Sequence, residues 1–150
     1  MAIPTLTVRQ PWASLIIAGF KIIENRSWPP PAKYMGKRIA IHAGGMLELE
    51  ALDQPWVKPY IAKLPNPMPR GAVIGTVMID KGTIPPGDLV NLGKRDRGDP
   101  LLEWWTPDHH GWMLCDPRAF SEPVRAQGNM GIWMWEPPEG FCDEFLPEHE

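Results

Sequence analysis

The chain has 150 residues and a formal net charge of −3, a length that fits one domain. Apolar residues make up 43% and charged residues 22%, the balance of an ordinary globular protein, and no apolar run reaches the roughly 20 residues of a membrane-spanning helix. The first residues lack the basic and long apolar segments of a secretion signal. We therefore expect a cytoplasmic protein without a membrane partner, in which Cys115 and Cys142 are free thiols.

Basic side chains are concentrated near the N-terminus. Residues 1–40 carry six basic side chains and one acidic one, a local charge of +5, whereas residues 41–150 carry nine basic and 17 acidic ones, a local charge of −8. A basic region of this kind steers anionic ligands toward one face of a protein. Five carboxylates lie in the last 13 residues. We therefore divide the chain into a domain at 1–136 and an acidic C-terminal tail at 137–150.

The beginning of the sequence predicts a strand, a short apolar helix and a second strand, at residues 5–8, 12–18 and 22–25. Pro11 suits the first turn of the helix, because its missing N–H would have no partner there, and Gly19 suits the left-handed cap that ends it. Side chains two apart in a strand share a face. Glu24 and Arg26 are therefore expected to project together, with Lys21 at the entrance of the second strand.

The later elements are expected to be strands at 37–42, 71–80, 110–115 and 131–135 and a helix at 46–56. Gly44 and Gly45 predict a turn after the first of these strands, and Gly75 predicts a bend or a close approach of another backbone. Short strands with only two modest helices predict an α+β fold built as a small mixed β-barrel with short flanking helices.

Three charged side chains lie within six residues and are the candidate catalytic group: Lys21, Glu24 and Arg26. A carboxylate near two cations stays ionised and can orient a water molecule. A lysine in an apolar pocket can lose its proton and act as a base or nucleophile, and an arginine can grip a phosphate with two nitrogens. The same three charges also fit a salt-bridge network that only pins the strand to the helix.

Five further residues are candidates for substrate binding. Arg9 and Gln10 lie at a strand-to-helix junction, where backbone N–H groups attract anions and an amide can read a base edge. Trp12 and Trp28 can stack on a nucleobase, worth roughly 1–3 kcal/mol per base, although each also fits a packing role. His42 ends a strand, which places it either at the mouth of a cleft or in a structural hydrogen bond.

Two expectations concern the residues before and within the strand predicted at 110–115. Trp104 and Trp105 fall in an irregular stretch, so at least one ring is expected to be exposed or to form a lid. His109, His110 and Cys115 resemble metal ligands, but no second ligand pair has the spacing of a zinc site. We therefore expect no metal and no cofactor.

Several segments together resemble the ASCH domain, a family of the PUA-like superfamily. They are LTVRQPWASLIIAG, the G-x-K-x-x-E-x-R motif at 19–26, YMGKRIAIHAG and RGAVIGTVMI. The resemblance is close over residues 5–80 and looser through Trp135. It implies a PUA-like mixed pseudo-barrel, with the motif residues gathered in a cleft beside the first helix. It also implies binding of single-stranded RNA or of a modified nucleoside.

The resemblance leaves two other functions open. One ASCH branch cleaves the acetyl amide of N4-acetylcytidine, with a lysine and an arginine that correspond to Lys21 and Arg26 but a threonine in the place of Glu24. Other members cleave single-stranded RNA. The first alternative is thus a metal-independent hydrolase of RNA or of an N4-acylated cytidine, acting through Lys21 and Glu24. The second is a protein-interaction module whose acidic tail binds a basic partner that the sequence does not name.

Overall fold

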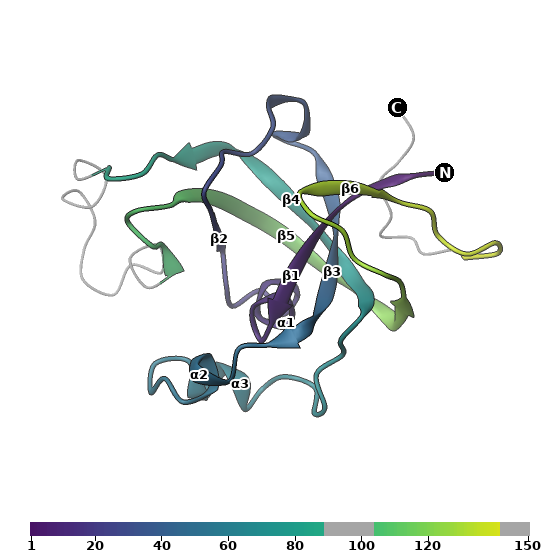
Figure 1. The fold of residues 1–150 in the computed structure, drawn as a ribbon, viewed down its shortest axis with the longest axis horizontal. Helices are drawn as coiled ribbons and strands as arrows, with labels where there is room; N and C mark the ends of the chain where they lie inside the picture. The colour runs from purple at the N-terminus through teal and green to yellow at the C-terminus, as the bar shows by residue number, and fades with distance from the viewer. Residues whose placement is uncertain (89–103, 142–150) are drawn as a thin grey trace.

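The computed structural model describes residues 1–88 and 104–141, which form a six-stranded sheet with short helices (Figure 1). The strands are β1 (Ile3–Gln10), β2 (Ile23–Arg26), β3 (Arg38–Leu47), β4 (Ala72–Ile84), β5 (His110–Arg125) and β6 (Ile132–Trp135). The helices are α1 (Trp12–Ile17), α2 (Leu49–Leu52) and α3 (Lys58–Ile61), and Ala32–Tyr34 forms a single 3-10 turn. The strands follow one another across the sheet in the order β2-β5-β4-β3-β1-β6.

The sheet is mixed, which confirms the α+β class. β1 runs parallel to β3, and the other neighbouring strands are antiparallel. A parallel pair needs a long crossover connection, and here α1 and β2 lie in that connection. Among the described strands, β2 and β6 are the ends of the sheet. Closure into a barrel therefore stays a prediction.

Helix α1 is the element around which the sheet is arranged. Five of its six residues are buried, and it contacts β1, β3, β4 and β5. Gly19 follows it with a φ of +86°, the left-handed conformation predicted for the cap. The N–H of Gly19 donates to the carbonyl of Ile16 at 3.0 Å. The chain thereby turns sharply out of the helix and into β2.

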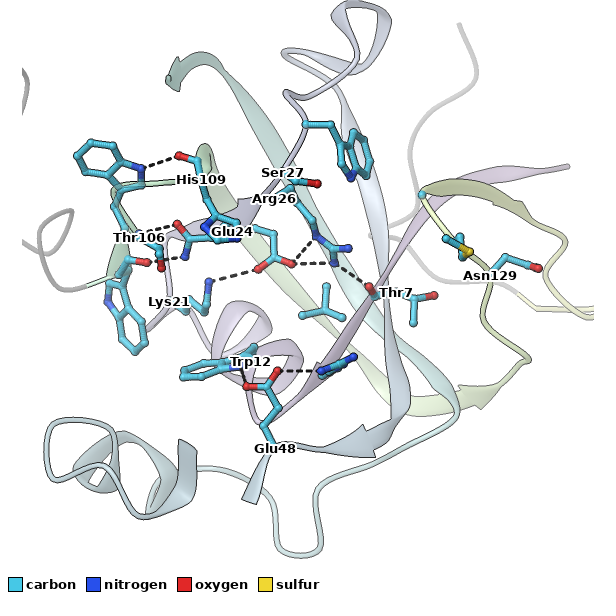
Figure 2. A pocket seen from close by; sticks show the side chains of 18 of the residues that line it. Thr7, Trp12, Lys21, Glu24, Arg26, Ser27, Glu48, Thr106, His109 and Asn129 are labelled. Carbon is cyan, nitrogen blue, oxygen red and sulfur yellow. Dashed lines mark hydrogen bonds and ion pairs between the residues drawn. The ribbon is translucent and has the colours of Figure 1, made fainter. Parts of the chain in front are cut away.

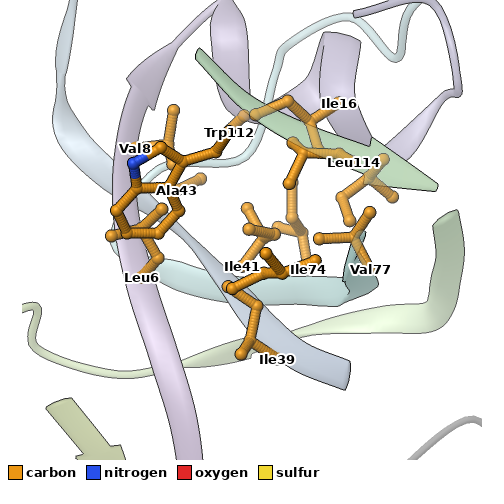
Figure 3. Close-up of a cluster of buried hydrophobic side chains, with 13 residues drawn as sticks. Leu6, Val8, Ile16, Ile39, Ile41, Ala43, Ile74, Val77, Trp112 and Leu114 are labelled. Atoms are coloured by element: carbon orange, nitrogen blue, oxygen red, sulfur yellow. The ribbon is translucent and has the colours of Figure 1, made fainter. Parts of the chain in front are cut away.

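The largest cluster of buried apolar side chains lies between α1 and the sheet (Figure 3). Trp112 of β5 is fully buried within it, beside Ile16 of α1 and Ile41 of β3. Complete burial of an aliphatic side chain contributes about 1.5–3 kcal/mol, so this cluster fixes the helix on the sheet. The position of α1 in turn fixes where the residues before and after it, at the end of β1 and the start of β2, face each other.

Gly75 allows two strands to approach closely, as the sequence predicted. A Cβ atom at this position would clash with the backbone carbonyl of Arg118 on β5 and lie 3.1 Å from the side chain of Ile17. The registers of β4 with β5 shift on both sides of this point. The glycine thus allows β4 to approach both β5 and α1 closely, at a point where the strand register is irregular.

The region after β3 differs from the prediction. Residues 44 and 45 form no turn, because β3 continues to Leu47, which pairs with Gln10 of β1 beyond a register irregularity. The helix predicted at 46–56 is only the one-turn α2. Strand pairing occupies its expected first residues, and Pro55 has no N–H with which to continue it. Trp56, at the end of the predicted helix, is 41% exposed.

The strands on either side of the undescribed residues 89–103 are longer than predicted. β4 extends to Ile84, and β5 continues through three register shifts to Arg125. The prediction of an exposed ring at 104–105 is wrong, since Trp104 and Trp105 are 4% and 6% exposed. Trp104 is covered by Trp56, with ring centroids 5.2 Å apart. The short-range pattern could not reveal this cover, because it comes from a distant segment.

The last described residues lie against the sheet. Phe141 packs on Phe120 and Trp135, with ring centroids 5.3 and 5.6 Å away. The rest of the predicted tail, at 142–150, lies outside the described residues, as does Cys142, whereas Cys115 is a free, exposed thiol. No helix in the described part of the chain combines the length and apolar character needed to cross a membrane.

Candidate functional site

A cavity of about 810 Å³ opens between β1, β2 and the segments at 104–109 and 129–131. Figure 2 shows Lys21, Glu24 and Arg26 at its centre, with Trp12 and Glu48 on one side of them. Five of the chain's eight tryptophans line this cavity, namely Trp12, Trp28, Trp56, Trp104 and Trp105. The cavity thus combines charged groups with a large amount of aromatic surface.

The structure brings most of the predicted site residues together. Six of the eight line the cavity, namely Arg9, Trp12, Lys21, Glu24, Arg26 and Trp28. The other two, Gln10 and His42, are 0% and 2% exposed and lie outside its lining. These six candidates therefore surround one cavity, whereas Gln10 and His42 have structural surroundings of their own.

Glu24 joins the two cations of the motif into one chain of charges. Its Oε1 lies 3.3 Å from Lys21 Nζ, and its Oε2 accepts a hydrogen bond from Arg26 Nε at 3.0 Å and lies 2.8 Å from Nη2 in an ion pair. Lys21 Nζ also donates to the carbonyl of Ile23. The Lys21 and Glu24 side chains are 5% and 8% exposed. Removal of one member of such a buried pair typically costs about 3–5 kcal/mol, because the remaining charge loses its partner.

Arg26 links β2 to a strand at the far side of the sheet. Its Nη2 donates to the carbonyl of Thr7 on β1 at 2.8 Å. β2 is at one end of the strand order and β1 is next to the other end. The sheet must therefore curl strongly. The Arg26 side chain bridges β1 and β2, which are not paired with each other in the sheet. Both the salt-bridge interpretation and the ligand-site interpretation of the motif fit this geometry, because the paired charges also line the cavity.

Burial away from water lowers the pKa of Lys21 below its ordinary value near 10.5. The positive charge of Arg26 adds to this effect, while the negative charge of Glu24 and its hydrogen bond oppose it. Nζ lies 5.9 Å from the centroid of the Trp12 ring, so one side of the amine faces an aromatic surface. The ammonium group of Lys21 therefore gives up its proton more readily than the ammonium group of a lysine in water.

A second ion pair lies on the rim. Arg9 Nη1 is 3.5 Å from Glu48 Oε1, and the indole N–H of Trp12 donates to Glu48 Oε2 at 2.8 Å. The Arg9 and Glu48 side chains are 60% and 37% exposed. Ion pairs with this exposure contribute only about 0.2–1 kcal/mol. Glu48 therefore orients the Trp12 ring but holds Arg9 weakly.

Asn25 fixes the wall opposite β1. Its Nδ2 donates to the carbonyl of Trp104, and its Oδ1 accepts the backbone N–H of Thr106, both at 2.8 Å. The indole N–H of Trp105 donates to the carbonyl of His109 at 3.1 Å. Both polar groups of the Asn25 amide are therefore occupied, and they hold the 104–106 segment against β2.

Gln10 and His42 stabilise the frame of the site. Gln10 donates to Ser14 Oγ and to the carbonyl of Pro69, both at 2.7 Å, and its Oε1 accepts the N–H of Ser14 at 3.0 Å. Its amide therefore closes the start of α1. His42 Nε2 donates to the carbonyl of Ala126 at 2.6 Å, and a Cβ at Gly128 would lie 2.8 Å from the imidazole. This contact seats the loop that leads to the cavity lining at 129–131.

Trp28 lies at the rim with one face already in use. Its ring meets Trp112 edge-on with centroids 4.7 Å apart, and its carbonyl accepts the Trp112 indole N–H at 2.9 Å. It is half-buried, so the remaining surface faces the cavity that it lines.

Sequence reasoning did not identify Glu48 or Asn25 as site residues, and it did not place the segments at 104–109 and 129–131 at the cavity. Glu48 was assigned to a helix, whereas the pairing of Leu47 with Gln10 brings it beside Trp12. No local pattern placed Glu48 beside Trp12. The residues at 104–109 and 129–131 likewise reach the cavity through tertiary contacts, and the sequence marked Trp104, Trp105 and His109 only as an exposed ring or lid and as resembling metal ligands. No group of three or more potential metal ligands occurs within 1–88 and 104–141.

The lowered pKa of Lys21 predicts a pH dependence of stability. Between the lowered pKa and 10.5, the unfolded chain binds more protons at this lysine than the folded protein does. The free energy of unfolding, compared with that of Lys21→Met, should therefore rise with pH across this window and level off above it. Urea unfolding of both proteins from neutral to alkaline pH measures the difference. Lys58→Met, exposed on α3, controls for the loss of a cation, and a difference that is flat or falls with pH contradicts the assignment.

Comparisons with known proteins agree with the resemblance seen in the sequence. The ASCH domain model of that family matches residues 6–83. The crystal structure of ASCH from Zymomonas mobilis is similar, with a TM-score of 0.47 and 16% identity over 81% of this chain and 72% of that one. A serine-to-alanine mutant of that protein gives a TM-score of 0.46 and 17% identity over 91% and 83%. No curated protein sequence gives a significant match. Because the family model covers more than half of its residues, the chain belongs to the ASCH domain family.

Proposed function

We propose that this ASCH domain binds a nucleoside unit, either within single-stranded RNA or as a modified nucleoside, in the cavity beside β1 and β2. The observation that carries the proposal is the convergence of Lys21, Glu24 and Arg26 with five tryptophans on one cavity of about 810 Å³. Ligand pockets commonly measure about 300–1,000 Å³. The cavity therefore has room for a base and its sugar, whereas the bases of a duplex stay stacked on each other.

The aromatic lining supports a flat ligand. Stacking on an aromatic side chain contributes roughly 1–3 kcal/mol per base and tolerates any base. Trp12 is half-buried, with its ring held by Glu48, and Trp56 is exposed at 41%. A tryptophan fixed in advance loses little conformational freedom on binding. These two rings are the candidate stacking surfaces, while Trp104 and Trp105 form the buried side of the wall.

The charges of the cavity support a ligand with polar edges. The contacts of Arg26 with Glu24 and Thr7 are made by Nε and Nη2, which leaves its Nη1 group for a ligand. Ser27 and Asn129 are exposed cavity residues with hydroxyl and amide groups that pair with base edges or a ribose. Gln10, first expected to read a base, is occupied by Ser14 and Pro69, so we assign base contacts to these residues instead.

The binding assignment predicts a loss of affinity when the cavity is altered. Isothermal titration calorimetry with the four ribonucleosides, N4-acetylcytidine and single-stranded RNA hexamers measures it. We expect Trp12→Leu and Arg26→Ala to weaken the best of these probes by at least about tenfold, because each removes a contact of roughly 1–3 kcal/mol. Arg70→Ala, exposed and outside the cavity lining, is the matched control.

Circular dichroism separates lost binding from lost folding in these variants. Trp12→Leu keeps an apolar side chain at the start of α1 and leaves the three motif charges in place. Equal affinity of wild type and a folded Trp12→Leu and Arg26→Ala for every probe would remove the cavity as the binding site.

Hydrolysis is the second candidate, favoured by the lowered pKa of Lys21 next to Glu24. A lysine with a lowered pKa loses its proton more readily and can then act as a base or nucleophile toward an acyl group. Glu24 would then hold the amine in place and stabilise the proton that it takes up. The same residues also serve a purely binding role, because Glu24 is shared by both cations.

The hydrolytic candidate predicts product formation without added metal. Incubation of the protein with N4-acetylcytidine, or with labelled single-stranded RNA, should give deacetylated nucleoside or shorter RNA by chromatography. Lys21→Met should abolish the product, and the rate should increase with pH as the amine loses its proton. Absence of product from compounds that calorimetry shows to bind would leave a binding domain without this activity. The alternative of a partner-binding acidic tail stays a prediction, since 142–150 are outside the described residues.

A further inference from the structure

Arg9 differs from the other cations of the cavity in its availability. Its side chain is 60% exposed, compared with 23% for Arg26 and 5% for Lys21. Lys21 and Arg26 share the buried carboxylate of Glu24 and also donate to backbone carbonyls. Both cations are therefore engaged by groups of the protein, and Arg9 is the cation that a ligand reaches most easily.

The partner of Arg9 is held by something else. Glu48 accepts the indole N–H of Trp12 at 2.8 Å through Oε2, whereas its Oε1 lies 3.5 Å from Arg9. An exposed ion pair at this distance is weak and is screened by salt. Glu48 can therefore keep its hydrogen bond to Trp12 while Arg9 leaves Glu48 and pairs with another anion.

Arg26 contacts the part of β1 on which Arg9 lies. Arg26 Nη2 donates to the carbonyl of Thr7 at 2.8 Å, and Thr7 and Arg9 both line the cavity from alternate positions of that strand. Alternate strand residues lie about 6–7 Å apart and share a face. Two guanidinium groups on one side of a cavity suit a phosphate, which accepts paired N–H donors from arginine.

We propose that Arg9 is the phosphate-binding cation of this cavity and that Glu48 is the counter-ion which a ligand's phosphate replaces. The inference rests on the proposed function and extends it from a nucleoside to a nucleotide, either free or as one unit of an RNA strand. The base lies against Trp12, whose ring Glu48 orients, and the phosphate lies toward β1 between Arg9 and the free edge of Arg26. Figure 2 shows Trp12 next to Glu48, and Arg26 next to Thr7.

Glu48 then has two separable roles, and Glu48→Gln distinguishes them. The amide oxygen of glutamine can still accept the Trp12 indole N–H, but the side chain no longer neutralises Arg9. The stacking surface should stay in place while affinity for phosphate increases. Glu50→Gln is the matched control, because Glu50 is an exposed carboxylate two residues away that does not line the cavity.

The test compares cytidine and uridine with their 5′- and 3′-monophosphates, and with single-stranded hexamers of the same base, by calorimetry at two salt concentrations. Wild type should bind a monophosphate more tightly than its nucleoside. Glu48→Gln should increase that ratio by about two- to fivefold, the effect of one exposed ion pair, and high salt should reduce the gain. Arg9→Ala should bring the ratio close to one, because it removes the cation that the phosphate contacts.

The outcomes separate this inference from the proposed function. Nucleoside binding with no preference for a phosphate, or a Glu48→Gln protein that behaves like Glu50→Gln, overturns the phosphate site and leaves the nucleoside site intact. Absence of binding by every nucleoside, nucleotide and hexamer overturns both. A gain in Glu48→Gln with hexamers alone supports the phosphate site and identifies an RNA strand as its source, whereas a gain with monophosphates identifies a free nucleotide as sufficient.

Discussion

The carboxylate of Glu24 is the group on which the rest of the site depends. It takes Lys21 on one oxygen and Arg26 on the other, and Arg26 passes the connection to the carbonyl of Thr7. β1 and β2 belong to distant parts of the sheet order. A buried carboxylate between two cations is stable because each charge has a partner, and neutralising it would leave two like charges together. One acidic residue thus both compensates the motif and draws two strands around the cavity.

This arrangement divides the cations of the cavity into two kinds. Lys21 and Arg26 are held by a buried partner and contribute to the frame, whereas the ion pair of Arg9 within the described residues is with the half-exposed Glu48. Burial also lowers the pKa of Lys21, so the frame contains an amine that gives up its proton more readily than a lysine in water. The ligand surface that we propose consists of what remains accessible: the ring of Trp12, the edge of Arg26 and the exposed polar residues of the rim.

Local sequence patterns predicted the part of the fold that local physics determines. The helix at the start of the chain, its Gly19 cap and the strand that carries Glu24 were confirmed, because proline, glycine and apolar spacing act over a few residues. The motif residues were brought together as expected. The helix predicted at 46–56 was wrong because long-range pairing of Leu47 with Gln10 took its first residues. Gln10 and His42 could not be placed, since their polar groups meet partners 59 and 84 residues away. The pairing of Leu47 with Gln10 brought Glu48 to the site.

The central claim is that the Glu24-centred cavity holds a nucleoside unit against Trp12. A crystal structure of the protein grown with cytidine 5′-monophosphate tests it most directly. The account predicts the base stacked on Trp12, the sugar and base edge next to Arg26, and the Lys21–Glu24–Arg26 contacts unchanged. Nucleotide bound elsewhere on the protein, or bound only after Glu24 has released both cations, would contradict it.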